Sequence, residues 1–115
     1  MPPTLGDRLA HILEAIDNLQ SFLSGQTAAT LAADLPRRLA IERSFEIICE
    51  AARHVPASVR AQETGIDWQK MTDLGNLLRH AYHRVDVGRM MTIAETDLAP
   101  LKEFVERIMQ EEKHR

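Results

Sequence analysis

The sequence has little cysteine, few aromatic residues and no excess of positive charge. Its 115 residues include one cysteine, Cys49, which excludes an intrachain disulfide and a zinc site built from several cysteines. The net charge of −3 argues against a protein that coats nucleic acid by bulk charge. No apolar run approaches the ~20 residues of a membrane span, and the first residues lack the basic and apolar regions of a signal peptide. We therefore expect a cytoplasmic protein with a reduced thiol and no membrane partner.

The charges are distributed unevenly along the chain. Residues 1–36 carry one base and four acids, residues 37–89 carry nine bases and seven acids, and residues 90–115 carry four bases and six acids. The middle segment is therefore mildly basic, and eight of its nine bases are arginines. Two interpretations remain open. The arginines are either ordinary solvated positions on helix faces or a local surface for anions, since a guanidinium can grip a phosphate with two hydrogen bonds.

The spacing of apolar residues predicts helices along the chain and no strands. No window alternates convincingly between apolar and polar residues, whereas apolar residues recur every three or four positions, as on one face of a helix. Four longer segments show this pattern. Their expected inward-facing residues are Leu5, Leu9, Ile12, Leu13, Ile16, Leu19 and Leu23; Leu39, Phe45, Ile48, Ala52 and Val55; Trp68, Met71, Leu74, Leu77, Leu78 and Tyr82; and Leu101, Phe104, Val105 and Ile108.

Capping and helix-breaking residues set the expected boundaries of these segments. Short helices are expected at 27–33 and at 89–95, and residues 110–115 are expected to fray. Four longer helices with short links predict an all-α fold, an up-down bundle in which residues 1–115 form a single domain. The expected N-caps are Thr4, Asp34, Asp67 and Asp97, and the expected breaks lie at Gly25, Pro56 and Asp86 or Gly88.

The segment 68–86 carries the residues best suited to chemistry. On a helix, Asn76, Arg79, His80 and His83 share one broad face, because positions three and four apart are neighbours. Histidine can accept or release a proton near neutral pH, and arginine can neutralise charge that develops on phosphate. These groups suit metal-independent RNA cleavage. The alternative is that two histidines fall at this spacing by chance and have no catalytic role.

A metal site has weaker support from the spacing. His80 and His83 lie three residues apart, but no third ligand is indicated except Asp86 or Glu50, and Cys49 stands alone. We therefore expect no metal and no other cofactor.

Several elements of the chain resemble the HepT-like family of the HEPN superfamily. The second helix ends in Cys49-Glu50-Ala51, similar to the family's Gly-Glu-Ala. Trp68 is similar to the family's tryptophan ahead of its motif. Gly75-Asn76-x-x-x-His80-Ala81-Tyr82, followed by Val85-Asp86, resembles the signature Arg-Asn-x-x-x-His-x-Tyr and Val-Asp. The likeness covers residues 5–109, roughly, and includes Asp97-Leu98-x-x-Leu101 at the start of the last helix.

The resemblance implies a HEPN-like helical domain that acts as the toxin of a type VII-like toxin–antitoxin pair. It implies a metal-independent endoribonuclease that cleaves RNA at a shared cleft of a homodimer. His80 would be the acid–base group, Asn76 would orient phosphate or support the site, and Tyr82 would contact substrate or histidine. In some members a minimal nucleotidyltransferase antitoxin attaches AMP to this tyrosine, which would block the cleft with a bulky anion.

One position departs from the family signature. The motif arginine falls on Gly75, and Arg79 lies one helical turn further on, about 6 Å along the axis. A glycine inside a helix costs about 1 kcal/mol relative to alanine, so a reason for it is expected. Three explanations compete: natural loss of activity, a site rebuilt around Arg79, or an introduced change.

The functional hypotheses therefore number three. The chain is an RNA-cleaving toxin that uses His80, Asn76 and Arg79, or a weakened family member that binds the nucleotidyltransferase or RNA, or a structural dimeric helical adaptor. Glu50 and Arg53 are candidate supporting residues. Glu50 either faces the cleft or is a surface glutamate that pairs with Arg53 or Arg79. His83 is either a supporting residue at the rim or a solvent-exposed side chain.

Overall fold

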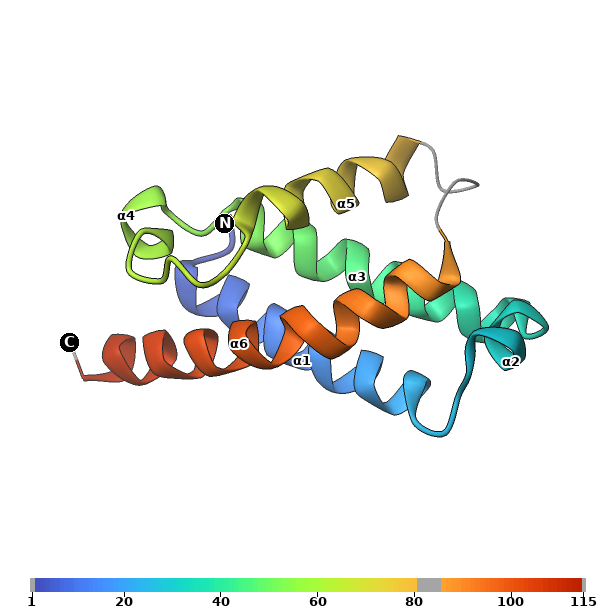
Figure 1. The fold of residues 1–115 in the computed structure, drawn as a ribbon. Helices are drawn as coiled ribbons and strands as arrows, with labels where there is room; N and C mark the ends of the chain where they lie inside the picture. Colours follow the sequence, from blue (N-terminus) through green and yellow to red (C-terminus); the bar gives the residue numbers. More distant parts are fainter. Residues whose placement is uncertain (1, 81–85, 115) are drawn as a thin grey trace.

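Helices alone account for the secondary structure of the residues that the computed structural model describes, 2–80 and 86–114 (Figure 1). Four longer helices and two short ones follow one another, which confirms the predicted all-α class. They are α1 (Leu5–Leu23), α2 (Ala28–Ala32), α3 (Leu35–Arg53), α4 (Ala57–Arg60), α5 (Trp68–His80) and α6 (Val87–Lys113).

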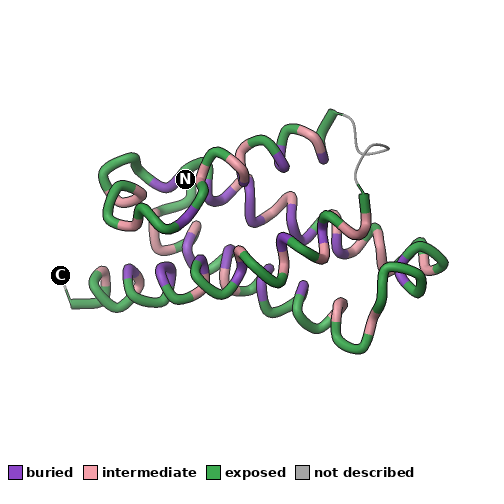
Figure 2. Tube along the Cα trace, viewed as in Figure 1, coloured by how far each residue is buried: buried purple, intermediate pink, exposed green. Residues whose placement is uncertain are grey.

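The four longer helices alternate in direction. In Figure 1, α1 and α5 run one way, and α3 and α6 run the other way. Helix α3 contacts both α1 and α5, while α6 packs along α1, and α2 closes the end of the bundle against α3 and α6. This up-down order places α5 on the outside of α3, where its outward face is open to solvent (Figure 2).

The core is formed by the apolar stripes of α1, α3, α5 and α6 (Figure 2). Leu9, Ile12, Ile16 and Leu19 of α1 have no exposed surface, as the spacing of three and four predicts. Burial of side chains of this size stabilises the fold by about 1.5–3 kcal/mol each. The stripes therefore determine how the helices pack.

The predicted N-caps are present at three of the helix starts. The side chains of Thr4 and Asp34 accept hydrogen bonds from the backbone N–H groups of Asp7 and Arg37. Asp67 accepts one from the backbone N–H of Lys70 at 2.9 Å. Each bond satisfies a backbone donor that has no partner within its helix. Gly25, with φ of 73°, provides the left-handed turn after α1.

The predicted helix start at Asp97 and the separate short helix at 89–95 are both wrong, because α6 is one continuous helix from Val87 to Lys113 with Pro100 inside it. Pro100 is exposed, so the carbonyl that loses its helical hydrogen bond can face water. The buried stripe runs past the proline, from Met90 and Ile93 to Leu101. Asp97 does not cap a helix; its carboxylate pairs with Lys70 Nζ at 2.7 Å.

The predicted inward position of Leu39 is also wrong. Leu39 is 51% exposed, whereas Ile41 is 1% exposed and lies in the core. Leu39 lies six positions before Phe45, a spacing that points its side chain well away from the helix face of Phe45 and Ile48. Ile41 lies four residues before Phe45 and so shares its face.

A membrane-spanning helix is not found among the residues that the structure describes, since none of their helices is long and apolar enough.

Candidate functional site

The candidate site lies where the last two turns of α3 meet the second half of α5. The two helices come close together at Cys49 and Gly75. A Cβ atom placed on Gly75 would lie 2.9 Å from Cys49 Cβ, closer than two carbon atoms tolerate. The contact atom is the root of the cysteine side chain, so no rotation of that side chain can relieve it. Close packing of the two helices therefore explains the glycine at position 75, because only a glycine lets α5 lie this close to α3.

Cys49 is a packing residue of this contact. Its side chain is 5% exposed, and burial raises the pKa of the thiol to about 12, while the nearby Arg79 acts in the opposite direction. The thiol is therefore neutral at physiological pH. Since the thiolate is the reactive form of cysteine, this side chain supports the helix contact and is not suited to nucleophilic chemistry.

Glu50, the residue after Cys49, gathers three basic side chains around one carboxylate. Arg53 donates to both oxygens, at 2.9 Å to Oε1 and 3.4 Å to Oε2. His54 Nε2 lies 3.1 Å from Oε1, and Arg79 Nη1 lies 3.1 Å from Oε2. Hydrogen bonds from Arg53, and then from His54, lower the pKa of Glu50 to about 2. Glu50 is therefore an anion at neutral pH and pairs with both arginines proposed for it from the sequence.

Arg79 connects the two helices through its two terminal nitrogens. Nη1 donates to Glu50 on α3, and Nη2 donates to Asn76 Oδ1, one turn earlier on α5, at 2.6 Å. The side chain of Arg79 is 31% exposed and that of Glu50 is 41% exposed. The guanidinium thus lies between the two helices at the surface. It brings together Asn76 and Arg79, predicted as catalytic residues, and Glu50, predicted as a supporting residue.

His80 is the last residue of α5 and is exposed. It makes no hydrogen bond or ion pair with another residue that the structure describes. Its ring is accessible for proton transfer. His80 lies four residues after Asn76, so the two residues share a face of α5.

Two predicted site residues, Tyr82 and His83, lie outside the described residues, 2–80 and 86–114. Their proposed roles therefore stay predictions. Asp86, which follows them, accepts a hydrogen bond from the backbone N–H of Gly88 at 3.0 Å and is the N-cap of α6. Among the described residues, no three His, Cys, Asp or Glu side chains gather closely enough to hold a metal ion.

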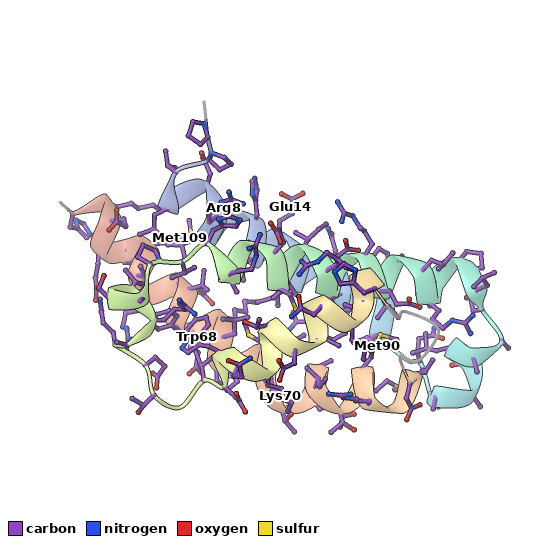
Figure 3. All side chains as sticks on the ribbon, turned by 90° about the horizontal axis from the view of Figure 1, so that it is seen from above. Arg8, Glu14, Trp68, Lys70, Met90 and Met109 are labelled. Atoms are coloured by element: carbon purple, nitrogen blue, oxygen red, sulfur yellow. The ribbon has the colours of Figure 1, made fainter. Side chains whose placement is uncertain are left out.

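Trp68 anchors the first turn of α5 at some distance from this polar cluster. Its ring meets Phe104 of α6 edge to face, with centroids 5.4 Å apart, and its Nε1 donates to the carbonyl of Glu63 at 3.4 Å. Trp68 and Lys70 both lie where the start of α5 meets α6 (Figure 3). The tryptophan therefore supports the fold and is not part of the polar cluster.

His54 is the residue that the sequence reasoning missed. It stands at the C-cap of α3, and its ring reaches back one turn to Glu50. Its spacing of four residues from Glu50, and its position next to Arg53, are the signals that could have indicated it.

The fold and the site define a small all-helical protein with an exposed cluster of arginine, histidine and asparagine around one carboxylate. Residues 12–108 match the family described as HepT-like, ribonuclease HepT-like. The chain belongs to this HepT-like ribonuclease family. No solved structure matches the chain.

Three relatives show the range of this similarity. The chain is 29% identical over 102 residues to the "Probable ribonuclease HepT" of Thermococcus cleftensis, which covers 89% of this chain and 93% of the relative. It is 27% identical over 105 residues to a "Putative RNase" of Caldanaerobacter subterraneus, covering 91% and 94%. It is also 29% identical over 103 residues to the "Gamma-glutamylcyclotransferase and putative RNase" of Methanocaldococcus jannaschii. That match covers 90% of this chain but only 46% of the relative.

Proposed function

We propose that this chain is a metal-independent endoribonuclease, the toxin of a type VII-like toxin–antitoxin pair. The observation that carries the proposal is the match to the HepT-like ribonuclease family, together with the exposed side chains of Asn76, Arg79 and His80 on the last two turns of α5. These are residues that can hold a phosphate and move a proton. The proposal gives each of them a step in RNA cleavage.

The reaction is a transfer of the phosphodiester to the neighbouring 2′-oxygen. His80 takes the proton of the 2′-hydroxyl, and the freed oxygen attacks phosphorus. The bond from phosphorus to the 5′-oxygen breaks, the leaving oxygen takes up a proton from water, and His80 returns the proton that it took to the solvent. The products are a 2′,3′-cyclic phosphate and a 5′-hydroxyl. Arg79 stabilises the negative charge that builds on the phosphate oxygens, and Asn76 holds Arg79 in position.

A homodimer with a shared cleft is part of the proposal. Exposed leucines on α3 support it, since Leu35 and Leu39 are each 51% exposed. Leu39 also lines a groove of about 330 Å³ together with Leu78 of α5, next to the polar cluster. Two copies that meet over this face would bury these leucines and would double the positive charge near the substrate.

Control by an antitoxin completes the proposal. A cognate minimal nucleotidyltransferase would attach AMP to Tyr82, and the added negative charge would repel RNA phosphate. Toxin and antitoxin would meet in the cytoplasm, where RNA is available. A small nucleotidyltransferase gene next to this gene would support the pairing.

The test combines growth and product analysis. Expression of the chain should arrest growth, and the purified protein should cleave RNA in excess EDTA to fragments with 2′,3′-cyclic phosphate ends. His80→Ala should abolish both effects. Growth arrest and cleavage that persist in His80→Ala would overturn the assignment. Light scattering on the purified chain should give the mass of a dimer.

A second candidate is a weakened family member that acts by binding the nucleotidyltransferase or RNA. Two observations favour it. Gly75 has no side chain that could bind phosphate, and the guanidinium of Arg79 is already paired with Glu50. Because Gly75→Arg alone would clash with Cys49, the informative variant is Cys49→Gly with Gly75→Arg. A sharp gain in cleavage for this double variant would favour the weakened member. No gain would favour a site rebuilt around Arg79.

A further inference from the structure

The basic side chains around the Glu50 carboxylate could bind another small oxyanion in the same place. Both of its oxygens are bound: Arg53 and His54 reach Oε1, and Arg53 and Arg79 reach Oε2. Arg53 therefore binds the carboxylate in a bidentate way, through Nε and Nη2. A phosphodiester also presents two oxygens and one negative charge, and arginine binds carboxylate and phosphate with the same planar geometry.

The cluster has more positive than negative charge. Two guanidinium groups surround one carboxylate, and the ring of His54 lies against the same carboxylate. Glu50 remains ionised throughout, because the surrounding hydrogen bonds hold its pKa at about 2. An excess positive charge is therefore left over for an anion from solution.

The groups are open to solvent and come from two helices. Side-chain exposure is 52% for Arg53, 40% for His54 and 31% for Arg79. Arg53 and His54 end α3, while Arg79 belongs to α5 and directly precedes His80. Ion pairs this exposed stabilise only weakly, and the glutamate side chain can rotate away from its partners. An incoming phosphate can therefore take its place at little cost.

We propose that Arg53, His54 and Arg79 form a phosphate-binding subsite that Glu50 occupies in the free chain and that a backbone phosphate of RNA takes over. Glu50 is then an internal competitor for RNA, and His54 becomes part of the RNA-binding surface. The inference rests on the proposed function for the identity of the ligand. It adds Arg53 and His54 to the residues that bind RNA, and Arg79 is then shared between the phosphate held there and the one that is cleaved.

The test measures binding of an RNA that cannot be cleaved. A fluorescent 2′-O-methyl RNA oligonucleotide lacks the attacking hydroxyl, so its anisotropy reports affinity alone. At about 50 mM salt, where screening is modest, Glu50→Gln should tighten binding about twofold to fivefold, the factor that corresponds to an exposed ion pair. Arg53→Gln and His54→Gln should each weaken binding by a similar factor.

Two controls separate the subsite from general electrostatics. Glu14→Gln makes the same change of net charge at an exposed position of α1. It should alter RNA affinity much less than Glu50→Gln. In the double variant Glu50→Gln/Arg53→Gln, most of the gain from Glu50→Gln should disappear. Circular dichroism should show that every variant is folded.

The possible outcomes are distinct. Unchanged or weaker binding by folded Glu50→Gln would overturn the subsite, as would an equal gain from Glu14→Gln. If the native chain cleaves ordinary RNA while Glu50→Gln fails to bind more tightly, the subsite alone is wrong. If the native chain neither cleaves nor binds RNA, the proposed function and the subsite both fail.

Discussion

The two halves of α5 are attached to the rest of the molecule by different interactions. The first half is held by packing: Trp68 meets Phe104 edge to face, and Met71 and Leu74 are buried. The second half buries Leu78 and touches α3 closely at Gly75, and it adds polar side chains that join α3 through the exposed contacts of Arg79 with Glu50. Apolar burial is worth several kcal/mol, whereas exposed ion pairs are worth about 0–1 kcal/mol.

Along α5, buried apolar residues therefore contribute mainly to stability, and exposed polar residues are available for function. Polar groups that must meet a substrate have to be exposed, and exposed ion pairs contribute little to folding. Buried side chains such as Met71, Leu74 and Leu78 supply the rigidity that the exposed polar groups cannot supply. Substitutions of buried residues in α5 should therefore act on folding, and those of exposed polar residues in its last turn should act on RNA.

The largest expected effect is on the packed half. Phe104→Ala should lower the free energy of unfolding by about 3–5 kcal/mol, because it removes a buried ring that contacts Trp68 and lies 5.3 Å from the Arg107 guanidinium. Urea unfolding followed by circular dichroism measures this loss. Phe104→Leu, which keeps much of the volume, should lose clearly less. A loss below about 1 kcal/mol for Phe104→Ala would show that packing does not hold this half.

The next effect concerns the close approach of the two helices. Gly75→Ala should cost about 1 kcal/mol of unfolding free energy, since overpacking of about 1–3 kcal/mol outweighs the helix-propensity gain of about 1 kcal/mol. The same cost should appear in a Cys49→Ala background, which keeps the clashing Cβ. In a Cys49→Gly background Gly75→Ala should instead stabilise. Urea unfolding of the six chains gives these differences, and a change that is equal in all three backgrounds would refute the contact.

The smallest effect is the pH dependence of Glu50. The pKa of Glu50 is lower in the folded chain, about 2 against the usual 4.5, so its stabilising contribution is present above pH 4.5 and is lost as the pH falls toward 2. At pH 6 the native chain should be more stable than Glu50→Gln, by less than about 1 kcal/mol because the pair is exposed. Unfolding measured from pH 6 to pH 2 should show this difference vanish. A difference that stays constant would mean that Glu50 keeps an ordinary pKa.

The helices and most of the core could be predicted from local spacing. Leu9, Ile12 and Ile16 are buried as their periodicity indicates, and Asp67 caps α5 as expected. The continuous α6 could not be predicted from local signals. Asp97 and Pro100 together read as a helix start, but the apolar stripe of α6 packs along α1 and carries the helix past them.

The candidate site could be predicted in part. Asn76, Arg79 and His80 stand out because they lie within five residues on one helix. The contact between Cys49 and Gly75 joins positions 26 apart in the sequence, and no local pattern shows that the two helices meet there. That contact supplies the packing reason for a glycine at position 75 that the sequence left open. His54 was overlooked because a histidine at the end of a helix is common, and only the folded chain shows its ring at Glu50.

In the proposed function, the exposed side chains in the last turn of α5 serve RNA chemistry while buried side chains hold the fold. RNA cleavage in excess EDTA and urea unfolding, measured on the same preparations of the native chain and of His80→Ala, test this division. Cleavage should fall at least about a hundredfold, as for loss of a general acid–base group, while the free energy of unfolding should be unchanged within about 0.5 kcal/mol. Cleavage that survives in a folded His80→Ala protein would contradict this division.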